Sequence, residues 1–592
     1  MLDENKILLA VICEDETEFA QQSHLFSNNL IAVPNIGSFK FEYSIAVKEK
    51  NLAATCNLMC RNNNAKYKVF FTAPLTLNKN VIWSMLLKFL LNPKIGILGL
   101  FGSEMPITGD YTQAENLYGS YFFKDSLGDV YEYKGKPPVL YQPVHMIDSG
   151  FFITSQDIPF DEEMGDDFFI AAQCCRYRRA GYDVAVVYFE EAAVLFSKNK
   201  IIYNDKPDDE NYRQQLNKFK QSYKDFVTPL VSICIPTYNQ PHFFEIALQS
   251  ALAQTYENIE IIVGDDSTNE DTKNLIQPYL EHFDNIKYFY HGGPLGGHGL
   301  KNITFTVNHS VGSYVNVLFH DDVIYPEKIY RMMEYFAGDL ENKIVLTTSA
   351  RHLINENGQI IERKNPWQPA QDAILDGEEV GRKILFLKEN FLGELSTVLF
   401  KRESLLSKDP QTGEKIFDIG IFCGVKDVAY GDIGSFLNLF KDGGKCVFIK
   451  DCLSAFRQHS QQNTYNPLMR TRLFIEFMNY FTIAWLNNLY FRDFEEYKCC
   501  CDGWKVFLDR NYDWNTPEDS SDDIKRFKEL LRNFSRLVVE KKYPEILDCS
   551  IRFLLDVLHE NNSIRPLVRQ NETTGLFEKA FDGIMFNGEQ RY

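Results

Sequence analysis

The chain has 592 residues, a formal net charge of −19 and a hydrophobic content of 45%. So long a chain exceeds what a single core supports and predicts about three to four domains. The negative charge argues against nucleic acid as a partner, and a bound nucleotide would need a cation between itself and so acidic a protein.

The N-terminal apolar run, residues 7–12, is too short for the core of a signal peptide. No stretch reaches the roughly 18 apolar residues that a membrane span needs. We therefore expect a cytoplasmic protein without a transmembrane segment, while peripheral contact with a membrane or a partner enzyme stays open. The 13 cysteines include no CxxC pair, so they are expected to be reduced thiols rather than zinc ligands.

Residues 1–200 have the pattern of a first α/β unit, in which short apolar runs alternate with stretches of helical periodicity. Strands are predicted over 6–13, 66–72, 95–101 and 184–189, and helices over 80–92 and 167–180. Residues 201–228 are polar and charged, and are predicted to be a linker or an exposed helix.

Residues 229–464 form the predicted second unit, which begins with three apolar runs that each end in polar residues. The runs cover 230–235, 259–263 and 314–319, and they are followed by Pro236-Thr237-Tyr238-Asn239, Gly264-Asp265-Asp266 and His320-Asp321-Asp322. Helical spacing between the first two runs makes a βαβ unit and therefore a parallel sheet. Ligands bind at the carboxyl ends of such strands, so these polar residues are candidates for a site.

Residues 465–592 carry aromatic and apolar residues at helical spacing and are predicted to be a helical C-terminal region. Its apolar stripes are either core or an interaction face.

Together the motifs of the second unit resemble family-2 glycosyltransferases of the GT-A fold. The matching stretches are 231–239, 250–256, 261–268, 312–315, and 320–322 with Pro326, all in the order of the family. The resemblance implies an α/β fold with a Rossmann-related, mixed and mostly parallel sheet. It also implies an inverting transfer from a nucleotide sugar.

The first unit is similar to a bacterial branch of glycosyltransferase-like domains, through residues 66–70, 78–80, 95–99, 147–150 and 179–182. Two GT-A-like domains in tandem are thus implied. The branch usually carries an acidic residue right after the strand at 66–71, where this chain has Thr72-Ala73-Pro74-Leu75. Asp148, Asp166 and Asp167 remain, but acidic residues at loop ends are usually solvated. We expect the first unit to be inactive, with a scaffolding or acceptor-binding role.

The resemblance assigns the donor base to the turns that follow the first two strands of the second unit. Pro236, Thr237, Tyr238 and Asn239 would line the base pocket, with the Tyr238 ring stacked on uracil. Asp266, beside Asp265, would accept a hydrogen bond from uracil N3. The alternative is that both carboxylates only cap the turn that follows them.

The Asp321-Asp322 pair corresponds to the acidic metal motif of the family. Asp322 would bind Mn²⁺ or Mg²⁺ directly, and Asp321 would lie nearer the ribose or the metal-bound waters. His459 would complete the metal shell and Arg457 would contact the diphosphate. Phe319 departs from the family, because many members have a further Asp there. The alternatives are a solvated acidic pair and a structural histidine.

The acceptor side is assigned to the loop with Gly393 and Glu394 and to the catalytic-base position of the family. Asp432 is the predicted base, which takes the proton of the acceptor hydroxyl, and Asp427 is its alternative. Asp432 could instead be the N-cap of a following helix.

These inferences predict an inverting, metal-dependent glycosyltransferase that moves a sugar from a nucleotide sugar, most simply UDP-linked, to a glycan or glycoconjugate of a bacterial surface. Two rivals stay open. A nucleotidyltransferase would show a basic Gly-rich loop after the first strand, and Pro236-Thr237-Tyr238-Asn239 is not one. A non-catalytic sugar- or nucleotide-binding scaffold would bind UDP without hydrolysis or transfer.

Overall fold

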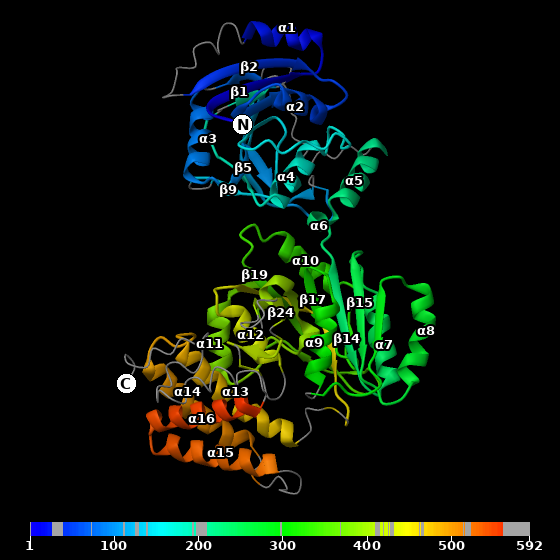
Figure 1. Ribbon diagram of the computed structural model, residues 1–592, viewed down its shortest axis with the longest axis vertical. Helices are drawn as coiled ribbons and strands as arrows, with labels where there is room; N and C mark the ends of the chain where they lie inside the picture. The colour runs from blue at the N-terminus through cyan, green and yellow to red at the C-terminus, as the bar shows by residue number, and fades with distance from the viewer. Residues whose placement is uncertain are drawn as a thin grey trace. The chain divides into compact units, whose positions relative to one another are not determined.

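A computed structural model of the chain divides into two compact units, one built mainly from Met1–Pro229 and one from Leu230–Tyr335 and Lys343–Tyr592 (Figure 1). The structure describes residues 2–25, 39–72, 74–77, 79–110, 113–124, 130–135, 137, 140–191, 194–196, 210–296, 299–366, 369–408, 415–417, 419–423, 425–426, 431–460, 462, 467–512, 514 and 522–560.

The first unit is built on a 7-stranded sheet with the order β2-β1-β3-β11-β5-β12-β9. Strand β1, which lies between β2 and β3, is buried from Ile7 to Cys13, as expected for a strand covered on both faces. The strands are β1 (Asp3–Cys13), β2 (Lys40–Val47), β3 (Ala65–Thr72), β5 (Ile95–Gly99), β9 (Gln142–Pro143), β11 (Phe151–Thr154) and β12 (Asp183–Val186). The helices are α1 (Glu16–Leu25), α2 (Leu52–Arg61), α3 (Lys79–Leu91) and α4 (Phe169–Arg179).

A second, 6-stranded sheet completes the first unit. It contains β4 (Pro74–Leu77), β6 (Phe101–Ser103), β7 (Leu117–Lys124), β8 (Val130–Lys134), β10 (Met146–Ile147) and β13 (Val194–Phe196). The side chains of residues 72–79 and the whole of Ala73 lie outside the described part, so the structure does not test how this acid-free stretch is arranged.

Of the two predictions for residues 201–228, a linker or an exposed helix, helices are observed where these residues are described. Residues 210–227 form α5 (Glu210–Ser222) and α6 (Lys224–Val227), and residues 201–209 lie outside the described part. Tyr212 and Phe219 are buried, and each ring lies 5.2 Å from that of Phe168. Their spacing of seven places them on one face of α5, so this face belongs to the core of the first unit.

The second unit is built on a 10-stranded sheet whose main path is β16-β15-β14-β17-β22-β19-β27-β18. All seven residues of β14 are buried. The strands are β14 (Val231–Thr237), β15 (Ile259–Asp265), β16 (Ile286–Tyr290), β17 (Tyr314–Val317), β18 (Val323–Ile324), β19 (Ile344–Ile354), β20 (Ile360–Lys364), β21 (Ala373–Asp376), β22 (Leu399–Lys401) and β27 (Lys445–Arg457). Two small hairpins pair β23 (Leu406–Lys408) with β24 (Lys415–Phe417) and β25 (Ile421–Phe422) with β26 (Val425–Lys426).

Helices connect these strands and cover the sheet of the second unit. They are α7 (Pro241–Leu252), α8 (Asp271–His282), α9 (Leu300–His309), α10 (Lys328–Ala337), α11 (Gly377–Leu387) and α12 (Asp432–Phe440), with a 3-10 turn η4 (Leu395–Thr397). Pro241 begins α7, where its missing N–H is not needed.

The two units share one sheet topology. The block β2-β1-β3-β11-β5-β12 and the block β15-β14-β17-β22-β19-β27 have the same chain order and the same pattern of directions. In each block the first three strands are mutually parallel and the fourth is antiparallel to both of its neighbours. The last two strands of each block are parallel again. The first unit is thus a second copy of the fold of the second unit.

The C-terminal region is helical, as predicted, and it belongs to the second unit. It consists of α13 (Pro467–Leu486), α14 (Phe494–Asn511), α15 (Asp522–Val539) and α16 (Tyr543–Glu560), which lie together beside α11 and α12 (Figure 1). One apolar core joins them to the sheet, because it contains residues of β14, α12 and α13 alike. The predicted fold class is confirmed: two α/β units of GT-A type in tandem and a helical C-terminal region.

Among the described helices, none combines the length and the apolar character required to cross a membrane.

Candidate functional site

The candidate base pocket lies where β14 and β15 end, and Asn239 ties the two turns together. Its backbone N–H donates to Ser267 Oγ at 2.9 Å, and its Oδ1 accepts from the Thr268 backbone N–H at 2.9 Å. Asn239 has a φ of 51°, a conformation that asparagine adopts more readily than most residues. Tyr238, beside it, is 44% exposed, so the face of its ring is open to a stacking partner.

The two neighbouring carboxylates after β15 have different surroundings. Asp265 is fully buried and satisfied, since its Oδ1 accepts from the Ser267 N–H at 2.9 Å and its Oδ2 from the Tyr288 hydroxyl at 2.6 Å. For Asp265 the alternative of a turn-capping role therefore matches the geometry. Asp266 is 4% exposed, and its Oδ1 is buried without a hydrogen-bond partner among the described residues.

Burial, together with the charge of Asp265, raises the pKa of Asp266, although a backbone N–H from Leu295 works against the shift. A buried oxygen without a donor costs free energy unless something supplies one. Asp266 is thus poised to accept a hydrogen bond from a ligand. Thr237 Oγ1, at the end of β14, is buried and unpartnered as well.

A second acidic group follows β17. Asp321 Oδ2 lies 3.0 Å from His459 Nε2, an ion pair when the imidazole is protonated. Burial opposes ionisation of Asp321, but the hydrogen bond from His459 and the charges of His320 and His459 leave its pKa below the ordinary value. Asp322 is 1% exposed, and its Oδ1 accepts from the Arg457 backbone N–H at 3.0 Å. Burial, and then the charge of Asp321, raise the pKa of Asp322 well above its ordinary value.

The structure gives Arg457 a different task from the predicted contact with diphosphate. The residue is 2% exposed, and its guanidinium donates to the backbone carbonyls of Asp321, Asn355 and Glu356 at 2.8 to 3.2 Å. The guanidinium also lies over the Phe243 ring at 4.8 Å. Arg457 thus fixes the acidic turn from behind, and its contact with a donor stays a prediction.

The fit of a divalent cation was tested on the acidic pair. Within the described residues, no three His, Cys, Asp or Glu side chains are grouped so as to hold a metal by themselves. Mg²⁺, however, is often bound through one or two carboxylates with the remaining ligands from water and substrate phosphates. Asp322 Oδ2 is buried and has no partner among the described residues, so it offers one free anionic ligand beside Asp321. The residues present therefore fit a cation that arrives with a diphosphate.

Lys328 lies beneath this pair and was not found from the sequence. It is fully buried at the start of α10, its ammonium donates to the backbone carbonyl of Ser396, and burial lowers its pKa to about 7 against the attraction of Asp322. Its spacing of four from Met332 and of eight from Phe336, both buried, places it on the apolar face of α10. This spacing was the signal available in the sequence.

The candidate base lies at the start of α12. Asp432 is the first residue of the helix, and the preceding Gly431 is its N-cap with a φ of 76°. Asp432 is therefore not the N-cap. Asp432 Oδ2 accepts from Asn390 Nδ2 at 2.7 Å, and burial, with a contribution from the charge of Glu394, raises the pKa of Asp432 to about 6. Asp427, the alternative base, lies outside the described residues.

Asn390 also organises the predicted acceptor loop, a role that sequence reasoning missed. Its Nδ2 donates to the Gly393 carbonyl at 2.9 Å, and its Oδ1 accepts from the Leu392 and Gly393 N–H groups at 3.1 Å. Gly393 has a φ of 94°, which favours glycine. Next to it Glu394 is paired with Arg351, whose Nε lies 2.7 Å from Glu394 Oε2. The charge of Glu394 raises the pKa of both Asp322 and Asp432, so the loop lies near both carboxylates.

The matching edge of the first unit carries a different group. The Lys48 N–H donates to the Cys13 carbonyl at 2.8 Å, just as the Asp266 N–H donates to the Thr237 carbonyl at 3.0 Å. Lys48 therefore occupies the position of Asp266. Its ammonium is paired with Glu14 and, at 3.1 Å, with Asp166, whose other oxygen accepts from the Leu52 N–H at the start of α2.

Comparison with known protein families identifies both units. Residues 9–223 match the model described as "Glycosyltransferase like family", and residues 232–381 match "Glycosyl transferase family 2". The chain carries two glycosyltransferase-family domains in tandem. The family resemblance inferred from the sequence motifs is confirmed, and the second match includes the turns with Asp266 and Asp322.

Curated relatives of these glycosyltransferase domains are similar over part of their length. An uncharacterised glycosyltransferase of Rickettsia typhi is 36% identical over 149 residues, which is 25% of this chain and 45% of the relative. The GalNAc(5)-diNAcBac-PP-undecaprenol β-1,3-glucosyltransferase of Campylobacter jejuni is 28% identical over 184 residues, 30% of this chain and 54% of the relative. The Escherichia coli chondroitin synthase is 29% identical over 143 residues, 24% of this chain and 20% of the relative. The chain thus spans about a fifth to a half of these relatives.

Among solved structures, residues 1–349 of S. aureus TarS in complex with UDP-GlcNAc match with a TM-score of 0.38 and 14% identity, covering 61% of this chain and 98% of that one. A likeness at this level does not bear on ligands or mechanism.

Proposed function

We propose that the second unit is an inverting glycosyltransferase that moves a sugar from a UDP-linked donor to a hydroxyl group of a glycan or glycoconjugate. Three carboxylates carry the proposal: Asp266 and Asp322 each keep a buried oxygen without a partner among the described residues, and Asp432, oriented by Asn390, has a raised pKa. The curated relatives with named activities are a glucosyltransferase and a chondroitin synthase, which supports a sugar donor.

Donor binding is assigned to the turns after β14 and β15. The Tyr238 ring stacks on the base, and Asp266 Oδ1 accepts the uracil N3–H. Pro236, Thr237 and Asn239 shape the pocket, while Asp265 holds its wall through Ser267 and Tyr288. Cytosine has no N3 proton, so Asp266 selects uracil.

The diphosphate is assigned to the turn with Asp321 and Asp322. Mn²⁺ or Mg²⁺, when bound there by Asp322, neutralises the charge that grows on the leaving UDP. Asp321, held by His459, lies beside the ribose or the water ligands. His459 would hold the cation only through a free ring nitrogen, and its Nε2 lies 3.0 Å from Asp321 Oδ2.

The proton of the acceptor hydroxyl is assigned to Asp432. Its Oδ2 is oriented by Asn390, and a base whose pKa lies near the working pH accepts a proton while remaining mostly ionised. The loop with Gly393 and Glu394 positions the acceptor. In-line attack on the anomeric carbon then expels UDP and inverts the configuration.

A UDP-release assay with UDP-glucose, UDP-galactose, UDP-GlcNAc and UDP-GalNAc, each with Mn²⁺ and with Mg²⁺, tests the proposal. We expect release with one donor, increased by an acceptor glycan. Binding of UDP without release from any donor would instead support the scaffold interpretation.

The turnover should fall on the acidic side of about pH 6, because Asp432 acts as a base only when it is ionised and its pKa is raised to about 6. Well below that pH the rate should drop about tenfold per pH unit. Among the described residues, Glu394 is the charged neighbour that raises this pKa, so Glu394→Gln should move the acidic limb to lower pH. The measurement is the pH at which turnover falls to half of its maximum, and not the size of that maximum. A limb that stays in place in Glu394→Gln would contradict the assignment.

We further propose that the first unit has no UDP site. A lysine ammonium has only donors, so Lys48 at the position of Asp266 cannot accept the uracil N3–H. Its pairing with Glu14 and Asp166 occupies the same edge. Isothermal titration of the whole chain with UDP and Mn²⁺ should give one site, and Asp266→Ala, which removes the acceptor oxygen, should abolish it. Two sites, one of which survives in Asp266→Ala, would assign UDP binding to the first unit as well.

A further inference from the structure

The placement of the proposed base depends on helix α12. Asp432 is its first residue, and every residue from Ile433 to Phe440 is buried. Two hydrogen bonds fix the helix to the loop before it, since Ser435 Oγ accepts from the Gly420 N–H at 2.7 Å and Asn438 Oδ1 from the Cys423 N–H at 3.2 Å. A helix enclosed in this way moves only if its neighbours move.

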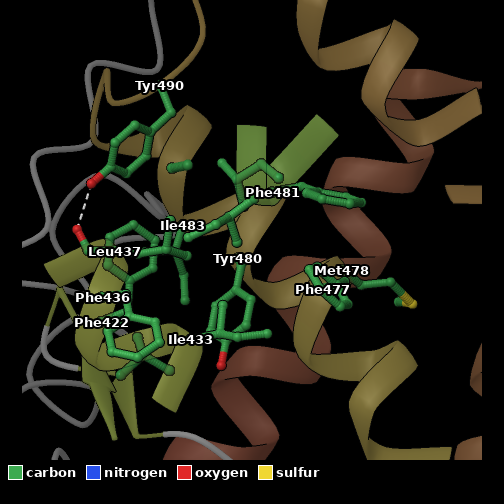
Figure 2. Packing of buried hydrophobic residues seen from close by; sticks show 14 of the residues in the cluster. Phe422, Ile433, Phe436, Leu437, Phe477, Met478, Tyr480, Phe481, Ile483 and Tyr490 are labelled. Atoms are coloured by element: carbon green, nitrogen blue, oxygen red, sulfur yellow. Dashed lines mark hydrogen bonds between the residues drawn. The ribbon is translucent and has the colours of Figure 1, made fainter. Parts of the chain in front are cut away.

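The C-terminal helices form one wall of this enclosure. Figure 2 shows Phe422, Ile433 and Phe436 packed close to Tyr480 of α13, and the Tyr490 hydroxyl turned toward the Leu437 carbonyl of α12. Phe422 and Tyr480 lie 6.2 Å apart, ring to ring, in an edge-on arrangement. This part of the wall combines apolar contacts with the hydrogen bond from Tyr490 to α12.

Tyr490 is the point at which the C-terminal region touches two helices of the glycosyltransferase fold at once. Its side chain is buried, its hydroxyl donates to Leu437 O in α12, and its ring lies against Gly381 of α11. A Cβ on Gly381 would come within 2.3 Å of the Tyr490 ring, so the contact needs a glycine. Tyr490 has a φ of 61°, a left-handed conformation that persists in a bulky residue only when its surroundings enforce it.

An ion pair fixes the same two regions a short distance away. Arg382 of α11 donates Nη1 to Glu496 Oε2 at 3.0 Å and Nη2 to Oε1 at 2.9 Å, in the paired geometry that arginine favours. The hydrogen bond from Arg382 lowers the pKa of Glu496, at the start of α14, to about 2. The C-terminal helices are thus attached by apolar contacts and by an ion pair, which reach α11, α12 and Phe422 of β25.

We infer that the C-terminal helical region is a brace that holds α12, and with it Asp432, in place, and that Tyr490 is its positioning residue. The inference rests on the proposed function in so far as Asp432 is the base. The donor carboxylates Asp266 and Asp322 lie on turns after β15 and β17, whereas Tyr490 contacts α11 and α12. Loosening the brace therefore impairs proton removal and leaves donor binding intact.

The variant Tyr490→Phe tests this, because it removes the hydroxyl and keeps the ring that fills the space against Gly381. We expect faster hydrogen–deuterium exchange of the amides of 433–440, with no change in those of β14 and β15. The UDP affinity, measured by titration with UDP and Mn²⁺, should stay within about twofold. The kcat for UDP release should fall about fivefold to tenfold, the effect of one buried hydrogen bond transmitted to the base.

Tyr512→Phe is the matched control. Its hydroxyl lies 3.3 Å from Thr471 Oγ1 inside the C-terminal helices, so the change deletes a comparable buried hydroxyl away from α12. We expect unchanged exchange in 433–440 and unchanged kcat. Equal losses in both variants, or unchanged exchange of α12 in Tyr490→Phe, would overturn the inference. If the wild type releases no UDP from any donor, the proposed function fails, but the exchange of α12 still decides whether the brace exists.

Discussion

Replacing Asp432 with asparagine is expected to abolish sugar transfer while leaving UDP binding unchanged. The substitution keeps the shape of the side chain but removes the group that takes the acceptor proton. Because Asp432 starts α12 and is not part of the turns with Asp266 and Asp322, the nucleotide pocket should be unaffected. We expect kcat to fall by at least about a thousandfold, the upper part of the range for loss of a general base.

The measurement is steady-state UDP release together with titration of UDP and Mn²⁺ on the same preparation. Asp442→Asn is the matched control, since Asp442 is exposed and lies just beyond the other end of α12. It should keep full activity. Wild-type activity in Asp432→Asn would refute the base assignment and move attention to Asp427. Lost UDP binding would instead place Asp432 on the donor side.

The fold was readable from the sequence because its parallel strands are buried on both faces. Such strands appear as uninterrupted apolar runs, as in β14, and the polar residues that end them stand out. The equivalence of the two units was only suspected, because it is a property of strand order and direction. The equivalence of Lys48 and Asp266 is visible only from the pairing of β1 with β2 and of β14 with β15, and from the backbone hydrogen bond that follows each pair.

Side-chain roles were less predictable than side-chain positions. The neighbours Asp265 and Asp266 look equivalent in the sequence. Both oxygens of Asp265 accept a hydrogen bond, whereas one oxygen of Asp266 has no partner among the described residues. The family resemblance assigned Arg457 to the diphosphate, and this contact stays a prediction. Its guanidinium, which has five N–H donors, donates to the backbone carbonyl of Asp321 and to those of Asn355 and Glu356 in the turn after β19.

The C-terminal helices illustrate a limit of periodicity. An apolar stripe shows that a helix buries one face, but it does not show against which partner. The partner here is the fold that carries Asp432, and the contacts join residues more than 50 positions apart, such as Tyr490 and Leu437. Only the three-dimensional packing connects this region with the candidate site.

Replacing Asp322 with alanine should abolish transfer and also weaken UDP binding in the presence of Mn²⁺. Asp322 has a buried oxygen without a hydrogen-bond partner among the described residues, and its pKa is raised well above the ordinary value. A cation stabilises the ionised form of a buried carboxylate, and the cation in turn binds the diphosphate. We therefore expect Mn²⁺ and UDP to bind together. We expect kcat to fall at least about a thousandfold and the affinity for UDP with Mn²⁺ to fall about tenfold to a hundredfold.

Replacing Asp322 with alanine also removes a hydrogen-bond acceptor, and this structural effect must be distinguished from the loss of charge. Asp322 Oδ1 accepts the Arg457 N–H at 3.0 Å, and alanine leaves this buried donor unpaired. Asp322→Asn retains an oxygen for Arg457 and loses only the charge, so it should unfold at nearly the wild-type temperature and still be inactive. Asp271→Ala, at an exposed carboxylate that begins α8, is the control for activity. If Asp322→Asn retained both turnover and Mn²⁺-dependent UDP binding, the charge would have no role, and a cation would have to be bound elsewhere. If UDP binding without Mn²⁺ fell as steeply as binding with it, Asp322 would act on the nucleotide itself rather than through a cation.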